Sequence, residues 1–97
     1  MTIKSLLELQ ITPEALNRAA DLLHKVLADT RAFDGCLGVE VLIDEKDPAH
    51  IVIAETWQSL AHDDAYRSWR AGDGASNLGT ILASAPVLTR FALASEI

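Results

Sequence analysis

The chain has 97 residues, of which 49% are hydrophobic and only 5% aromatic, and its formal net charge is −6. This length fits a single domain over residues 1–97, with a core built mainly from aliphatic side chains. Fourteen acidic residues against eight basic ones argue against a nucleic-acid partner and against an anionic membrane surface, because both require clustered positive charge. The single cysteine cannot form an internal disulfide, and no apolar run is long enough to span a bilayer, so we expect a cytoplasmic protein.

The first half of the chain predicts a strand, a helix and a pair of strands. Apolar residues alternate over residues 3–11, and Thr12-Pro13-Glu14 is typical of a helix start, with Thr12 as the cap. Apolar residues at helical spacing continue to about Arg31. Two segments rich in β-formers follow, over residues 36–44 and 50–57. The short polar turn between them predicts an antiparallel hairpin.

The second half predicts two helices and a last strand. Ser59 is expected to cap a helix that runs to about Arg70, and a short helix is expected over residues 76–85. A strand over residues 87–93 completes the chain. This order of elements is typical of a ferredoxin-like split β-α-β, an α+β fold with a four-stranded antiparallel sheet and helices on one face.

The sheet face without helices is also predicted to be apolar. By alternation it should carry Leu6, Leu42, Val52, Ala54, Leu88 and Ala92, or their neighbours where the register differs by one residue. Arg90 is expected on the same face, where it would pair with Glu8 or Glu40. A sheet with one solvated face normally alternates more cleanly, and the mean hydropathy of +0.18 is high for a small domain. We therefore expect two chains to pack sheet to sheet as a two-fold homodimer.

Three segments, taken in order, carry a family pattern. The first is residues 31–38, a helix end followed by the strand start Gly35-Cys36-Leu37-Gly38. The second is the turn Asp47-Pro48 followed by a strand that ends in Glu55-Thr56-Trp57. The third is Trp57-Gln58-Ser59, which leads into the second helix. Together they resemble the antibiotic biosynthesis monooxygenase family of dimeric α+β barrels, and the resemblance covers nearly the whole chain.

The resemblance implies a homodimer with a cavity in each subunit between the sheet and its helices. It also implies a monooxygenase that oxidises a quinol or an aromatic polyketide-like molecule with O2 and uses no cofactor, neither metal nor flavin. Some relatives bind and degrade haem, so the family determines the fold better than the reaction. This chain has Tyr66 where many members have a histidine. Its first strand also lacks the asparagine that haem-degrading relatives use, which counts against haem cleavage.

The second predicted helix carries the candidate site. His62, Tyr66, Trp69 and Arg70 are spaced i, i+4, i+7 and i+8, so they share one helix face, and Trp57 lies just before the helix. An apolar pocket with a few polar groups is typical of a small-molecule site. We predict His62 as the base that deprotonates a phenol, with Tyr66 and Arg70 holding the oxyanion. Trp57 and Trp69 are predicted to bind the substrate.

Each of these residues also has a purely structural interpretation. The aromatic side chains of Trp57, Tyr66 and Trp69 would equally serve as core residues. His62 would lie near the helix cap, and Arg70 would complement the helix dipole. The alternatives left open are a non-catalytic domain that binds a small apolar ligand, a structural dimer of the same fold, and a haem-binding protein. The three histidines and the one cysteine show no metal-ligand spacing, so no metal site is expected.

Overall fold

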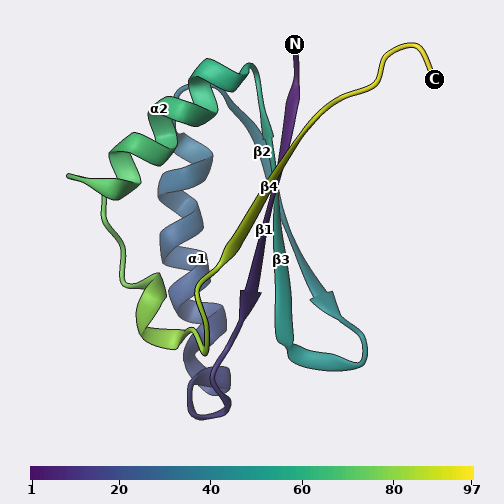
Figure 1. The fold of residues 1–97 in the computed structure, drawn as a ribbon. Helices are drawn as coiled ribbons and strands as arrows, with labels where there is room; N and C mark the ends of the chain where they lie inside the picture. The colour runs from purple at the N-terminus through teal and green to yellow at the C-terminus, as the bar shows by residue number, and fades with distance from the viewer.

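The computed structural model describes residues 1–97 as two layers, a four-stranded antiparallel sheet and helices that cover one of its faces (Figure 1). The strands have the spatial order β2-β3-β1-β4, and their bounds are Ile3–Gln10 for β1, Cys36–Asp44 for β2, Asp47–Trp57 for β3 and Val87–Ala92 for β4. The helices are α1 (Leu16–Ala32) and α2 (Leu60–Ala71), with the 3-10 helices η1 (Pro13–Ala15) and η2 (Leu78–Ile81). This topology confirms the predicted ferredoxin-like α+β fold. No helix is both long and apolar enough to cross a bilayer.

The predicted elements differ from the structure mainly at the helix ends. Ser59 caps α2 as expected, because its hydroxyl oxygen accepts a hydrogen bond from the backbone N–H of His62 at 3.2 Å. The side chain of Thr12 makes no such bond, although its backbone is extended immediately before η1. The helix predicted over residues 76–85 is reduced to the four residues of η2. Gly79 lies inside this segment, and glycine disfavours a longer helix there.

The helix-covered face holds a mainly aliphatic core. The inward residues of α1 are Ala19, Leu23, Val26, Leu27 and Thr30. The leucines and alanine among them pack on alternate residues of β1 and β3, including Leu9, Ile51 and Ile53. Burial of a side chain of this size contributes about 1.5–3 kcal/mol. The α1 stripe therefore holds the helix against the sheet and positions its last two turns beside α2.

The uncovered face of the sheet carries apolar side chains on every strand, together with the charged residues Lys4, Glu8 and Glu40. Cross-strand partners lie on the same face, and the pairs Leu6↔Ala54 and Leu42↔Val52 place all four side chains opposite the helices, as predicted. Leu42 is 50% exposed. Apolar side chains therefore remain open to solvent on this face of a single chain.

The predicted face of β4 is wrong by one residue. β4 takes its register from β1, and the pairs Leu6↔Thr89 and Glu8↔Val87 put its odd-numbered residues on the uncovered face. Leu88 and Ala92 therefore face the helices. The residues of β4 on the uncovered face are instead Val87, Thr89 and Phe91. A one-residue difference in register moves every side chain to the opposite face.

The same register corrects the prediction for Arg90. Arg90 pairs with Ser5 across the strands, on the helix side, and does not meet Glu8 or Glu40. Its Nη1 donates to Oδ1 of Asp64 at 2.6 Å and lies 3.5 Å from Oδ2 of Asp63. Arg90 thus links the edge strand β4 to the first turn of α2.

Candidate active site

Four aromatic rings pack together where α2 crosses the end of the sheet. The ring centroids of Trp57 and Tyr66 are 4.9 Å apart, and Phe33 lies 5.3 Å from Tyr66 and 6.1 Å from Trp57, edge-on to both. Trp69 completes the cluster at 6.2 Å from Tyr66. Gly74 lies so close to the indole of Trp69 that a Cβ at this position would clash with it. The cluster is a solid part of the core, so its rings shape the space beside them without themselves enclosing an open pocket.

The phenol of Tyr66 belongs to a hydrogen-bonded network between α1 and α2. Its hydroxyl is 2.7 Å from Oγ1 of Thr30, and Nε of Arg70 donates to it at 2.8 Å. The guanidinium of Arg70 also donates to the carbonyl oxygens of Val26 at 2.7 Å and Gly74 at 3.1 Å. These contacts to α1, α2 and the connector after α2 fix the guanidinium of Arg70 beside the phenol of Tyr66.

A second polar cluster is ionic and lies on the sheet beside the aromatic rings. Oε1 of Glu55 accepts hydrogen bonds from Nε1 of Trp57 at 2.9 Å and from Nη2 of Arg67 at 2.5 Å. Arg67 also reaches the buried Asp63, with Nε 2.9 Å from Oδ1, and Ser5 donates to Oδ2 of Asp63 at 2.6 Å. One guanidinium thus lies between two carboxylates that are almost completely buried.

A cavity of about 240 Å³ lies between the sheet, α1, α2 and the connector to η2. Its walls are mostly aliphatic, from residues that include Leu7, Leu23, Val26, Leu27 and Ile53. Five polar residues line the same space: Glu55, Tyr66, Arg67, Arg70 and Ser76. An apolar cavity with a few convergent polar groups has the composition of a small-molecule site.

Glu55 is a titratable group that lines this cavity and has a clearly shifted pKa. Burial raises the pKa of Glu55, and this effect outweighs the lowering by the charge and hydrogen bond of Arg67 and by the indole N–H of Trp57. Both hydrogen bonds that the carboxylate accepts go to Oε1. Oε2 therefore has no hydrogen-bond partner in the protein and is available to a ligand.

The structure brings together only part of the predicted site. Tyr66 and Arg70 line the cavity, whereas His62 does not. Nδ1 of His62 is 2.6 Å from the hydroxyl of Ser59, and its ring packs against Gly35, where a Cβ would clash with it. Gly35 has a φ of +85°, so this close approach is made at a position that suits glycine.

The two predicted substrate-binding indoles are placed differently from each other. Trp57 is completely buried and contacts the site through its hydrogen bond to Glu55. Trp69 is half-buried and borders a separate, shallower groove with Arg70 and Gly74. Neither indole lines the cavity itself.

Glu55 is a site residue that was not predicted from the sequence, although the sequence contains a signal for it. Ile51, Ile53, Glu55 and Trp57 alternate along one strand, so an acidic side chain stands among residues that face the core. A buried carboxylate requires a cation, and Arg67 supplies it from α2. Arg67 also pairs with Asp63, four residues earlier on the same helix.

The arrangement combines three chemical capacities in one small space. The carboxylate of Glu55 can accept a proton, the phenol of Tyr66 can donate a hydrogen bond, and Arg67 and Arg70 can stabilise a developing negative charge. No group of three His, Cys, Asp or Glu side chains converges as a metal site would require.

The two-layer fold places the chain in a class of small α+β proteins with known structures. A candidate antibiotic biosynthesis monooxygenase from Deinococcus radiodurans is similar, with a TM-score of 0.82, 24% identity and coverage of 100% of this chain and 96% of that one. A conserved protein from Methanosarcina mazei Go1 is similar at a TM-score of 0.80 and 18% identity, over 94% of this chain and 91% of that one. Rv0793 from Mycobacterium tuberculosis is similar at a TM-score of 0.76 and 22% identity, over 99% of this chain and 98% of that one. These likenesses show the fold.

The sequence itself identifies the family. The family model described as antibiotic biosynthesis monooxygenase matches residues 2–77, from β1 to the connector after α2, and the chain belongs to this family. The match includes every polar residue that lines the cavity. A comparison with curated protein sequences gives no match.

Proposed function

We propose that the protein is a cofactor-independent monooxygenase that oxidises a quinol or aromatic polyketide-like molecule with O2. The observation that carries this proposal is the cavity, in which Glu55, Tyr66 and Arg70 present polar groups within aliphatic walls. A phenolic ring needs apolar walls for its faces and a few polar groups for its hydroxyls. Membership of a monooxygenase family supports oxygen as the second substrate.

The size of the cavity favours a small substrate. Its volume of about 240 Å³ is below the roughly 300–1,000 Å³ of sites for drug-sized ligands. One or two fused rings would fit this space without displacing core side chains. A haem has four pyrrole rings in one plane, so a haem-binding function fits the cavity poorly.

The proposed chemistry begins with loss of a proton from the quinol. The resulting anion transfers an electron to O2 more readily than the neutral phenol does, and the two radicals then combine. One oxygen atom stays on the ring and the other leaves as water, so quinol plus O2 gives hydroxyquinone plus water. The substrate supplies all four electrons that reduce O2, and the apolar walls exclude bulk water from the intermediates.

We assign the base to Glu55, since it lines the cavity, its Oε2 has no hydrogen-bond partner in the protein, and burial raises the pKa of its carboxyl group. Tyr66 and Arg70 are proposed to hold the substrate oxyanion, as the sequence suggested. The base role first considered for His62 passes to Glu55 because His62 lies beside Ser59, outside the cavity. Trp57 acts on the site by orienting Glu55 through its indole N–H.

The test is oxygen uptake with a panel of one-ring and two-ring quinols, with 18O2 labelling of the product. We expect uptake above a heat-denatured control and one labelled oxygen atom in each product molecule. Glu55→Gln should lower kcat about a hundredfold or more, whereas His62→Gln should change it less than about threefold. No uptake with any quinol would overturn the monooxygenase proposal. A large loss in His62→Gln with an active Glu55→Gln would overturn only the assignment of the base.

A second candidate is a non-catalytic domain that binds a small apolar ligand. It is favoured by the packing of Trp57 and Tyr66, which fill the space where an open aromatic pocket was predicted. The same quinols would then quench tryptophan fluorescence on binding, without oxygen uptake. Binding together with uptake would eliminate this candidate.

We also propose that two chains form a homodimer through the uncovered sheet face. Leu42, Val87 and Phe91 on this face are 50–55% exposed in the single chain. Large apolar side chains exposed on one face of a sheet are typical of an interface. Native mass spectrometry should give twice the 10.5 kDa of one chain, and Leu42→Lys should shift the protein toward the single-chain mass. A mass of 10.5 kDa at micromolar concentration would contradict the dimer.

A further inference from the structure

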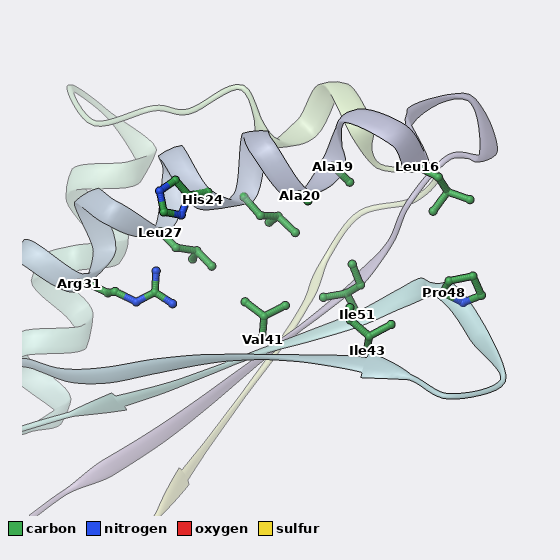
Figure 2. Close-up of a pocket in the computed structure, with 11 residues that line it drawn as sticks. Leu16, Ala19, Ala20, His24, Leu27, Arg31, Val41, Ile43, Pro48 and Ile51 are labelled. Carbon is green, nitrogen blue, oxygen red and sulfur yellow. The ribbon is translucent and has the colours of Figure 1, made fainter.

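A groove of about 350 Å³ runs between α1 and the strands β2 and β3, outside the candidate active site (Figure 2). One wall is the side of α1, and the other consists of Val41, Ile43 and Pro48. Eight of its eleven lining residues are hydrophobic, and none is Phe, Tyr or Trp. The rim is only partly covered, because Val41 is 37% and Ile43 63% exposed. The groove therefore leaves aliphatic surface in water that an aliphatic ligand would cover.

The groove is lined by basic side chains and by no acidic ones. Arg31 and His24 are its only lining residues with ionisable side chains, and no carboxylate lines it. Arg31 reaches from α1 toward Val41 at one end of the groove, as Figure 2 shows. Its only hydrogen bond goes to the carbonyl oxygen of Val39, at 3.3 Å. In a chain with fourteen acidic residues, an arginine without an ion pair beside an apolar groove marks a place for a ligand's negative charge.

We propose that this groove binds an aliphatic monocarboxylate, with its chain along α1 and its carboxylate at Arg31. A guanidinium binds a carboxylate through two parallel N–H groups, which a neutral head group cannot match. The walls favour a flexible chain over a flat ring, because they are aliphatic and contain no Phe, Tyr or Trp side chain. The volume lies within the roughly 300–1,000 Å³ of small-molecule sites.

The groove is separate from the cavity proposed for oxidation. Leu23 and Leu27 line both spaces, so these two side chains of α1 form the wall between them. The groove also lies on the helix side of the sheet, away from the uncovered face proposed for dimerisation. A ligand here would contact α1 and β2 without blocking either the cavity or the dimer.

The experiment is a titration of the 15N-labelled full chain with sodium decanoate, followed by amide chemical shifts. Decanol and decyltrimethylammonium carry the same chain with a neutral or a positive head, and they serve as matched ligands. We expect decanoate to shift amides of α1 and β2 that border the groove. It should bind at least tenfold more tightly than either matched ligand. Decanoate should also bind roughly tenfold more tightly than octanoate, because two further CH2 groups are buried.

Three variants test the residue assignment. Arg31→Gln should weaken decanoate binding at least tenfold and leave decanol unchanged. Arg31→Lys should restore only part of the affinity, because its ammonium keeps the charge but lacks the two parallel N–H groups of the guanidinium. Arg18→Gln is the matched control, because Arg18 is an exposed arginine of the same helix that does not line the groove. Val41→Asp should abolish binding by placing a carboxylate on the rim.

Several results would overturn the proposal. Shifts confined to residues of the cavity, such as Tyr66 and Arg70, would show that the acid enters the other site. Equal affinities for decanoate and decanol would show that Arg31 recognises no carboxylate. Groove amides that change with protein dilution instead of with ligand would identify a second copy of the chain as the occupant. An absence of shifts at millimolar decanoate would remove the site.

Discussion

The helix-covered face of the sheet has two contrasting ends. One end is an aliphatic core with members that include Leu9, Ile11, Ala19, Ile51 and Ile81. The other end holds four aromatic rings, two buried carboxylates and the arginine between them. Both ends bury their side chains to a similar extent, but only the aliphatic end follows from the hydrophobic effect alone.

The two ends also differ in the free energy of burying their side chains. Placing Glu55 and Asp63 out of water is unfavourable by several kcal/mol per charge unless each is well paired. A core made only of hydrophobic residues would avoid this cost. Buried charges with perturbed ionisation occur most often at functional sites, and the cavity opens at this end of the sheet. The aliphatic end holds the scaffold, and the ionic end carries the proposed chemistry.

The largest expected effect comes from removing the shared cation of the ionic end. Arg67→Met leaves Glu55 and Asp63 buried without their guanidinium, so the free energy of unfolding should fall by about 3–5 kcal/mol. Urea unfolding measures this change. The exposed Arg18→Met is the control and should stay within about 0.5 kcal/mol of the unmodified protein. A loss below about 1 kcal/mol would show that the two carboxylates are protonated or hydrated without Arg67.

A large-to-small substitution in the aliphatic core gives the comparison with Arg67→Met. Leu9 is 1% exposed, and Leu9→Ala should lower the free energy of unfolding by about 2–4 kcal/mol through lost burial and the space left behind. Oxygen uptake, if the proposed function holds, should survive under conditions where this variant stays folded. Loss of turnover in the folded Leu9→Ala protein would contradict the division between scaffold and site.

Removal of one hydroxyl from the network between the helices should have an intermediate effect. Tyr66→Phe keeps the ring in its cluster but leaves Thr30 and Nε of Arg70 without this partner. The expected loss is about 1–2 kcal/mol in urea unfolding, typical of buried groups that lose a hydrogen bond. In contrast, the exposed Ser68→Ala on the same helix should cause almost no change. Equal losses in the two variants would mean that the network contributes nothing specific.

The smallest effect should come from an exposed ionic cluster on the uncovered side. Hydrogen bonding to Asp44, and then to Glu8, raises the pKa of His50 above its ordinary value of 6.5. This contribution to stability is present below pH 6.5 and is lost as the pH rises through the higher folded-state pKa. The urea midpoint should therefore decline slightly more across this range in the unmodified protein than in His50→Gln. Identical slopes, with His24→Gln as the exposed control, would show that the contacts are too solvated to matter.

Much of the architecture could be predicted from local patterns. Alternation along residues 3–11 and 50–57, the helical stripe before Arg31 and the cap at Ser59 each report on a few neighbouring residues, and the structure confirms them. The face of β4 could not be predicted in the same way. Its six residues are all exposed in the single chain, so its own composition contains little information about which side faces the helices.

The candidate site could likewise be predicted only in part, namely where its residues are close together in the sequence. Tyr66 and Arg70 could be grouped by their helical spacing, and the structure brings them within 2.8 Å of each other. His62 has the same spacing but lies at the cap, where Ser59 and Gly35 determine its surroundings. Glu55 comes from a different element, and its partnership with Arg67 requires β3 and α2 to pack against each other.

The sequence by itself determined the order and type of the elements, the ferredoxin-like fold and the family. These depend on periodicity, capping and turn residues, which act over short stretches of chain. Only the tertiary structure decided which polar groups share a cavity, which side of the sheet β4 shows, and that Arg31 borders an aliphatic groove without an ion pair. Those features depend on distances between residues remote in the sequence, and such distances are set by packing and strand register.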